Sequence, residues 1–205
     1  MTRLVSLCRA SAIAAAALLA GCAAAPADRF YTLAGDSVAA PEAVAGAGAG
    51  RLYIEMAAVN VPAQVRRDQL LVGGADGRVD LLEHHRWAGP LADEIGNALS
   101  LGVTARLGAI DVYRTPHPDD VPVYRISTNV QRFESVPGGY ALVDAVWSVR
   151  QVGGGAVLTC RSVLREEAGQ GYEALVAGHR AALGRLAAAV AAGVRDLAAG
   201  RTAGC

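Results

Sequence analysis

The sequence predicts an α+β protein, organised as a single two-layer domain in which a mostly antiparallel sheet carries two helices packed on one face. Two apolar stripes recur at the three- to four-residue spacing of a helix, and three strand-length segments alternate apolar with polar residues. Glycine-rich turns separate those segments. The 205 residues are enough for one domain, or at most two small ones.

The first 22 residues have the pattern of a secretion signal that ends in a modified cysteine. Arg3 and Arg9 form a basic start, and the apolar run 10–20 is about half the length of a membrane-spanning helix. The run ends in Leu19-Ala20-Gly21-Cys22, which resembles the lipobox of bacterial lipoproteins. This resemblance implies that residues 1–21 are a signal peptide and that Cys22 is lipidated, with acyl chains such as palmitate. The alternative is an ordinary signal peptide followed by a chance cysteine.

Residues 22–50 are predicted to be the lipidated cysteine and a flexible tether, because Ala, Gly and Pro dominate them. One island, Arg29-Phe30-Tyr31-Thr32-Leu33, interrupts this composition. Its adjacent aromatic residues predict either a short strand that joins the sheet of the same chain or a peptide that docks onto a partner. We place the folded domain at residues 51–205.

The first half of this domain is predicted to hold a strand, a hairpin and a helix. Residues 52–56 alternate as in a half-buried strand, and residues 69–72 and 79–82 flank a glycine-rich turn as in a hairpin. A four-residue period then predicts a helix whose apolar stripe is Trp87, Leu91, Ile95, Leu99, Val103 and Leu107.

The second half is predicted to be a meander followed by a long helix. A short strand at 110–113 precedes three alternating strands at 123–133, 140–150 and 156–166. Residues 172–199 then repeat apolar residues at alternating steps of four and three, as in a helix. This apolar seam fits either packing on the meander or a coiled-coil contact with another protomer.

The sequence shows no catalytic, metal-binding or cofactor-binding pattern. A Gly-x-Ser-x-Gly elbow is absent, and a phosphate-binding loop of the Walker type is excluded because the chain has no Lys. His84 and His85 are neighbours on a predicted strand, so they point to opposite faces and are poor joint ligands. His117 lies in a Pro- and Asp-rich loop. We therefore expect no enzyme, no metal and no cofactor.

Charge and cysteine usage narrow the function further. Nineteen Arg balance nineteen acidic residues, which argues against a nucleic-acid partner. Removal of the signal takes Cys8 away and lipidation uses Cys22, which leaves Cys160 and Cys205 for a possible disulfide in an oxidising compartment. Cys160 lies on a predicted apolar face, as a small core residue does.

A turn at residues 62–69 is the candidate recognition surface. It exposes Arg66 and Arg67, whose planar guanidinium groups suit carboxylates on a partner. Trp87 is either packed on the core or an interface anchor. We predict a partner-binding surface made of Arg66, Arg67, Gln69 and Trp87, with a simple solvated turn as the alternative.

An ordered set of segments resembles the PqiC-type family of ABC-type transport auxiliary lipoproteins. In order, the set contains the lipobox, the Phe30-Tyr31-Thr32-Leu33 island, residues 59–72, Arg86-Trp87-Ala88 with Pro90-Leu91, the 125–133 strand and a strand with Trp147. The resemblance covers essentially the whole mature chain. Gln64-Val65-Arg66 and Asp68 depart from the family pattern in the turn, whereas Arg67 and Gln69 match it.

This resemblance implies a non-enzymatic role. The expected protein is anchored to the outer membrane, where Ala23 after Cys22 favours sorting, and faces the periplasm. Its expected partners are an MCE-domain protein and the associated ABC transporter, which move lipids or other hydrophobic molecules, and a homo-oligomeric ring is possible. A stand-alone periplasmic lipid-binding lipoprotein and a structural envelope lipoprotein are the alternative functions.

Overall fold

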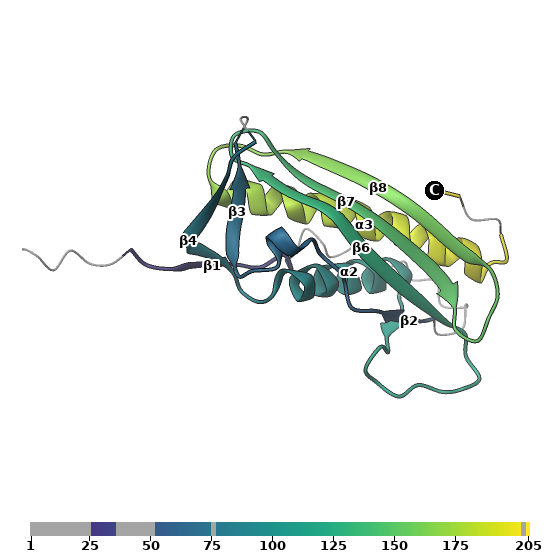
Figure 1. Cartoon of the computed structure of the whole chain (residues 1–205). Coiled ribbons are helices and arrows are strands. Elements are labelled where there is room, and N and C mark those ends of the chain that lie inside the picture. The colour runs from purple at the N-terminus through teal and green to yellow at the C-terminus, as the bar shows by residue number, and fades with distance from the viewer. Residues whose placement is uncertain (1–25, 36–51, 75–76, 202–203) are drawn as a thin grey trace, which may run out of the picture.

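The structure is a computed structural model that describes residues 26–35, 52–74, 77–201 and 204–205. It confirms the α+β class: strands and helices form separate layers (Figure 1). The signal peptide, Cys22 and most of the predicted tether lie outside the described residues. In chain order the elements are β1 (Arg29–Tyr31), β2 (Tyr53–Met56), η1 (Ala63–Val65), β3 (Gln69–Gly73), β4 (Val79–Trp87), α2 (Leu91–Leu107), β5 (Ile110–Asp111), β6 (Val123–Val136), β7 (Tyr140–Gln151), β8 (Val157–Glu167) and α3 (Tyr172–Ala198).

The strands divide between two sheets rather than forming one. The larger sheet has the order β5-β2-β6-β7-β8, and the smaller one has the order β1-β4-β3. The predicted meander is present, because β6, β7 and β8 pair antiparallel in sequence order. β2 instead runs parallel to both β5 and β6, and β1 runs parallel to β4. Parallel neighbours need long connections, which local turn signals in a sequence do not reveal.

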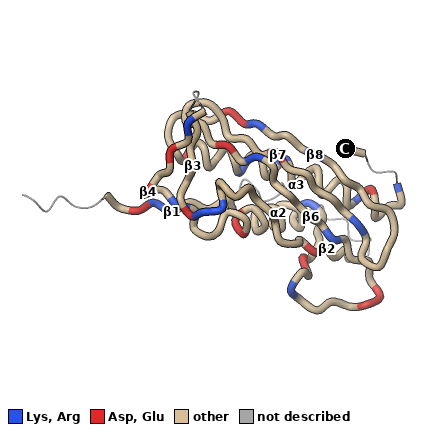
Figure 2. The backbone as a smooth tube through the Cα atoms, viewed as in Figure 1, with Lys and Arg blue, Asp and Glu red and all other residues tan. Residues whose placement is uncertain are grey.

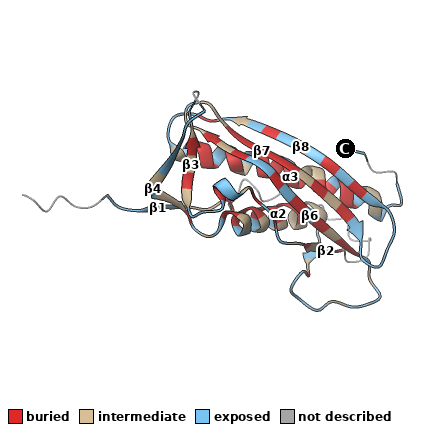
Figure 3. Ribbon diagram, in the orientation of Figure 1, coloured by how far each residue is buried: buried red, intermediate tan, exposed pale blue. Residues whose placement is uncertain are grey.

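The long helix α3 packs on the meander, as the first reading of its seam predicted. Val176, Leu183, Leu186 and Val190 are buried in the main core with the inward side chains of β7. At Gly193 an added Cβ would lie 2.6 Å from Leu158 Cδ2, so helix and sheet approach closely only because this position has no side chain. Figure 3 shows buried residues alternating with exposed ones along the strands over α3. The seam is therefore used within the domain and is not free for a coiled coil.

The shorter helix α2 lies beside α3 and begins later than its apolar stripe predicted. Pro90 takes an extended ψ of 131° at the N-cap, so Leu91 is the first helical residue. Trp87 belongs to the end of β4 instead. Gly108 ends the helix with a φ of 63°, the left-handed conformation that glycine adopts most easily.

Candidate partner-binding site

The turn between β2 and β3 is held on the domain by apolar side chains and points its charged residues outward. Pro62 occupies the N-cap position of the short helix η1. Val61, before this proline, and Val65, the last residue of η1, are 5% and 4% exposed. The turn closes where the Trp87 backbone N–H donates to the Asp68 carbonyl at 2.7 Å. The exposed residues between these fixed points therefore have a defined position rather than that of a free loop.

Arg66 and Arg67 are exposed and partly held by the turn itself. Arg66 Nη2 donates to the Val61 carbonyl at 3.1 Å, and Arg67 Nε donates to the Gln64 carbonyl at 2.9 Å. A guanidinium carries five N–H donors. Within the described chain each of these two arginines makes one side-chain hydrogen bond, and both residues are exposed. Gln69 opens β3 opposite Arg86 and is half-buried.

The prediction that Trp87 belongs to a binding surface is wrong. The indole is 5% exposed and meets Phe133 of β6 and His179 of α3 edge to face, with ring centroids 6.0 and 6.4 Å apart. Burial of a large aromatic ring against two other rings makes Trp87 a core residue. The candidate surface consists of the exposed turn residues, and Trp87 supports them from below through its backbone bond to Asp68.

The island at residues 29–33 docks onto the domain of its own chain, the first of its two predicted alternatives. β1 lies along β4, with Arg29, Phe30 and Tyr31 opposite His85, Arg86 and Trp87. Leu33 is fully buried, and its backbone N–H donates to Glu94 Oε2 of α2 at 2.7 Å.

Helix residues that sequence reasoning did not single out hold this segment in place. Thr32 Oγ1 donates to the same Glu94 oxygen at 2.7 Å, and Glu94 is 9% exposed. Arg180 of α3 donates to the Thr32 carbonyl through Nε at 3.0 Å and Nη2 at 2.7 Å. The segment thus joins β4, α2 and α3. The one available signal was an acidic residue in the first turn of a helix, which is common for reasons unrelated to docking.

The histidines that invited a metal-site reading make separate contacts. His84 Nδ1 lies 2.9 Å from Asp28 Oδ1, whereas His85 Nδ1 lies 2.8 Å from the Tyr31 hydroxyl. The hydrogen bond with His84 is the main cause of a lowered pKa for Asp28. His117 contacts the Pro118 carbonyl and stacks on Tyr53. No group of three His, Cys, Asp or Glu side chains placed to hold a metal ion occurs in the part of the chain that the structure describes.

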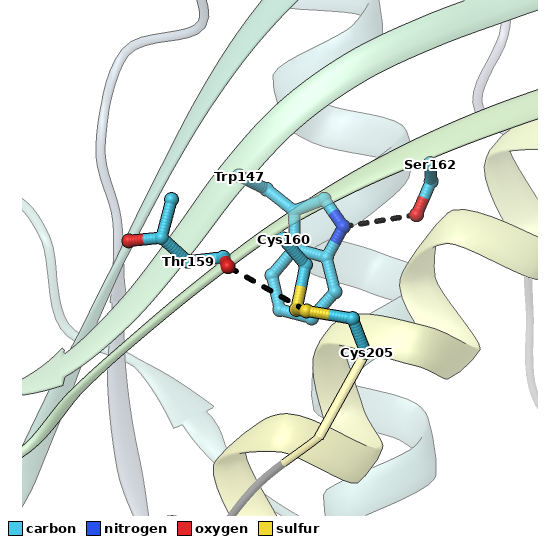
Figure 4. The surroundings of a disulfide bond; sticks show 5 residues. All are labelled: Trp147, Thr159, Cys160, Ser162 and Cys205. Carbon is cyan, nitrogen blue, oxygen red and sulfur yellow. Dashed lines mark hydrogen bonds between the residues drawn. A yellow bond between two sulfur atoms is a disulfide. The ribbon is translucent and has the colours of Figure 1, made fainter.

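Cys160 and Cys205 are joined in the structure. Their Cα atoms lie 5.6 Å apart, within the usual range for a disulfide, and the bond spans 45 residues. Figure 4 shows Cys205 bonded to Cys160 of β8 beside Trp147, whose indole N–H donates to Ser162 Oγ at 3.0 Å. The disulfide thus fastens the chain end to an edge strand of the larger sheet.

A buried carboxylate on β7 also escaped sequence reasoning. Asp144 is fully buried and accepts two hydrogen bonds from Arg161 of β8, at 2.9 and 2.7 Å. These bonds are the main cause of its lowered pKa. Figure 2 shows acidic and basic positions close to one another at several points of the described chain. Asp144 and Arg161 are one such pair.

Two surface hollows are large enough for a small ligand. The first, of about 510 Å³, lies between α2 and the segment after β2, and its lining includes Met56, Gly96 and Arg114. The second, of about 610 Å³, lies between β4 and the start of α3, and its lining includes Arg29, His85 and Tyr172. Charged and apolar side chains line both hollows. In the first hollow Ser100 Oγ donates to Asp111 Oδ2 at 2.6 Å.

Comparison with models of known protein families gives one match for this chain. The model of the ABC-type transport auxiliary lipoprotein component matches residues 31–191, which is most of the sequence. The chain belongs to this family. The match begins at Tyr31, the last residue of β1, and includes the docked residues Thr32 and Leu33. The family membership supports an auxiliary role in ABC-type transport and a lipoprotein character.

One solved structure shares the fold with a TM-score above 0.5. A crystal structure of a protein described as uncharacterized aligns with a TM-score of 0.62 at 17% identity and covers 84% of this chain and 99% of that one. A protein of the DUF330 family from Xanthomonas campestris has a TM-score of 0.49 at 14% identity, with 68% of this chain and 80% of that one covered. No curated protein matches the sequence. In the described residues, no helix combines the length and hydropathy needed to span a membrane.

Proposed function

We propose that this auxiliary lipoprotein is anchored to the outer membrane through Cys22 and serves, in the periplasm, as a non-enzymatic subunit of a transporter for lipids or other hydrophobic molecules. The observation that carries the proposal is the family match over residues 31–191. The Leu19-Ala20-Gly21-Cys22 pattern supports the anchor. The expected partners are an MCE-domain protein and its ABC transporter.

The exposed turn of Arg66, Arg67 and Gln69 is the proposed contact with that partner. Val61 and Val65 fix the turn, and the free guanidinium donors suit carboxylates. A preorganised contact loses little conformational entropy on binding. A homo-oligomeric ring would offer a second copy as an alternative neighbour for the same turn.

Charge reversal tests this surface. The Arg66→Glu, Arg67→Glu double variant should weaken assembly by a few kcal/mol if the contact is desolvated, and by little if it lies at the rim. Both residues are exposed, so the melting temperature should stay near that of the wild type. The measurement is recovery of the transporter subunits by the tagged, lipidated protein over a salt series.

A second double variant controls for the change in net charge. Arg114 and Arg150 are also exposed, and Arg114→Glu with Arg150→Glu makes the same charge change away from the turn. Full recovery with this control and loss with the turn variant supports the proposed contact. Equal recovery with all three proteins removes the turn from the interface.

The anchor is tested separately. Cys22→Ala should abolish acylation and move the protein out of the membrane fraction. Mass spectrometry of the intact protein and fractionation of the envelope measure both effects. A variant that still carried lipid and still sedimented with the outer membrane would rule out Cys22 as the attachment site.

The volumes of the two hollows make a stand-alone lipid-binding lipoprotein the alternative function to test. A stand-alone lipid carrier needs an apolar pocket, and volumes of 510 and 610 Å³ fall in the range of small-ligand sites. Their mixed polar linings suit a lipid chain less well. Mass spectrometry of lipids extracted from the purified domain distinguishes the two functions, because a carrier retains stoichiometric lipid beyond its covalent anchor.

A further inference from the structure

The docked N-terminal segment limits how far the domain can stand from its anchor. Arg29 lies seven positions after Cys22 in the sequence, and an extended chain over seven such steps reaches at most about 25 Å. If residues 26–33 were undocked, the chain from Cys22 to Leu52 would reach about 100 Å. Docking through Leu33, Glu94 and Arg180 therefore keeps β1 near the membrane that holds the acyl chains.

An exposed aromatic ring lies at this closest point. Phe30 is 64% exposed, more than any other large apolar side chain in the described chain. Its neighbours Arg29 and Tyr31 both reach Glu173 of α3, so Phe30 points to the other side of β1. Val79 and Leu81 of the same small sheet are also exposed, at 58% and 37%. Large apolar side chains in water are unfavourable unless something covers them.

The charges beside Phe30 are largely paired. Arg29 lies 3.2 Å from Glu173, and Asp28 lies 2.9 Å from His84. Arg86 lies opposite Phe30 and is close enough to Asp28 to contribute to the lowered pKa of that carboxyl. Charges of both signs therefore lie side by side around Phe30, which fits a zwitterionic headgroup layer. Aromatic side chains are enriched where proteins meet that layer.

We propose that β1, the edge strand of the small sheet, lies against the membrane and that Phe30 inserts into its headgroup layer. The proposal rests on the proposed lipidation of Cys22. It sets the orientation of the molecule, because the small sheet lies at one end and the loop between β5 and β6 lies at the other (Figure 1). α3, of 27 residues, spans about 40 Å between these ends. The β5–β6 end then projects into the periplasm.

A tryptophan placed at Phe30 reports this contact directly. The full-length lipidated Phe30→Trp protein is reconstituted into phosphatidylcholine vesicles with or without bromine on the acyl chains, since bromine quenches nearby indoles. The native Trp87 and Trp147 are 5% and 3% exposed, so they supply a constant background. We expect blue-shifted emission from the Phe30→Trp variant and loss of most of its added intensity, unchanged at high salt.

Val157→Trp is the matched control. Val157 is 60% exposed, close to the value for Phe30, but it begins β8 next to the β7–β8 turn, at the other end of the molecule. Its emission should not be quenched. Equal quenching of the two variants by the brominated lipids would overturn the membrane contact. Quenching of Phe30→Trp that high salt removes would also overturn it.

Mass spectrometry of the same samples separates this proposal from the anchor. If Cys22 carries no lipid and the protein stays off the vesicles, the anchor fails and the membrane contact fails with it. If Cys22 is acylated and Phe30→Trp is unquenched, the anchor stands and only the membrane contact of β1 is refuted. Unfolding curves that match the wild type show that each variant is folded.

Discussion

His179 shows how a single polar residue is placed in the middle of the core. Its ring stacks on Phe133 with centroids 3.9 Å apart, and Nε2 lies 2.8 Å from Ser135 Oγ. Nδ1 has no hydrogen-bond partner in the described part of the chain. Complete burial lowers the pKa of His179 to about 3, because the charged ring would lose its hydration.

This burial predicts acid sensitivity. The unfolded chain binds a proton at His179 near pH 6.5, whereas the folded protein binds it only near pH 3. The free energy of unfolding should therefore fall as pH drops from 6.5 towards 3, by at most about 1.4 kcal/mol per pH unit. His179→Gln keeps an amide donor for Ser135 and removes the titration. Urea unfolding at several pH values should show a shallower pH dependence than in the wild type, and an unchanged slope would contradict the assignment.

At the scale of elements, the N-terminal strand depends on one carboxylate. Glu94 accepts hydrogen bonds from Thr32 Oγ1 and from the Leu33 backbone N–H. Glu94→Ala leaves the Leu33 N–H buried without a partner, which costs about 1–3 kcal/mol. Hydrogen exchange should then quicken at residues 29–33.

The adjacent residue provides the control for this prediction. Asp93 lies in the same first turn of α2 but is exposed, so Asp93→Ala should leave exchange in the strand unchanged. Slow exchange in both variants would mean that pairing with β4 alone holds the segment.

The C-terminal tail is a second element held by one link. Closing a loop of 45 residues stabilises a fold by about 4 kcal/mol in the chain-entropy model. Cys205→Ser should lower the free energy of unfolding by up to that amount, and reductant should lower it similarly in the wild type. Reductant should have no effect on the variant. Equal stability of the wild type with and without reductant would show that Cys160 and Cys205 are not bonded in solution.

Local sequence patterns predicted where helices and strands lie in the chain better than they predicted which strands pair with each other. The periodic seam gave α3 nearly to its ends, and alternation gave β6, β7 and β8, because both signals come from residues close in sequence. The parallel pairing of β2 with β6 brings together strands about 70 residues apart, and no turn signal marks it. The division into two sheets was invisible for the same reason.

The candidate site was predicted only where exposure follows from local chemistry. Arg66 and Arg67 were expected on the surface because they are charged residues in a turn after Pro62. Trp87 was assigned to the helix because its four-residue spacing from Leu91 matches a helical stripe. In the structure Trp87 ends β4, and the helix begins at Leu91 after Pro90 at the N-cap. The roles of Glu94 and Arg180 depend on contacts with a segment more than 60 residues away, which the sequence does not show.

The whole molecule is one domain whose two described chain ends are both held on the fold. Its N-terminal strand is integrated into the fold, its C-terminus is fastened to β8, and an arginine-bearing turn remains exposed. The family match gives this arrangement an auxiliary role in ABC-type transport. The proposed additions are the outer-membrane anchor, the lipid cargo and the MCE-domain partner.

The partnership with a transporter is tested most directly by affinity purification of the lipidated wild-type protein from detergent-solubilised envelopes, followed by mass spectrometry of the bound chains. We expect an ABC ATPase, its permease and an MCE-domain protein to be recovered together, and the Cys22→Ala protein to recover less of them. Recovery of the lipidated protein with none of these chains, under conditions that preserve other transporter complexes, would contradict it.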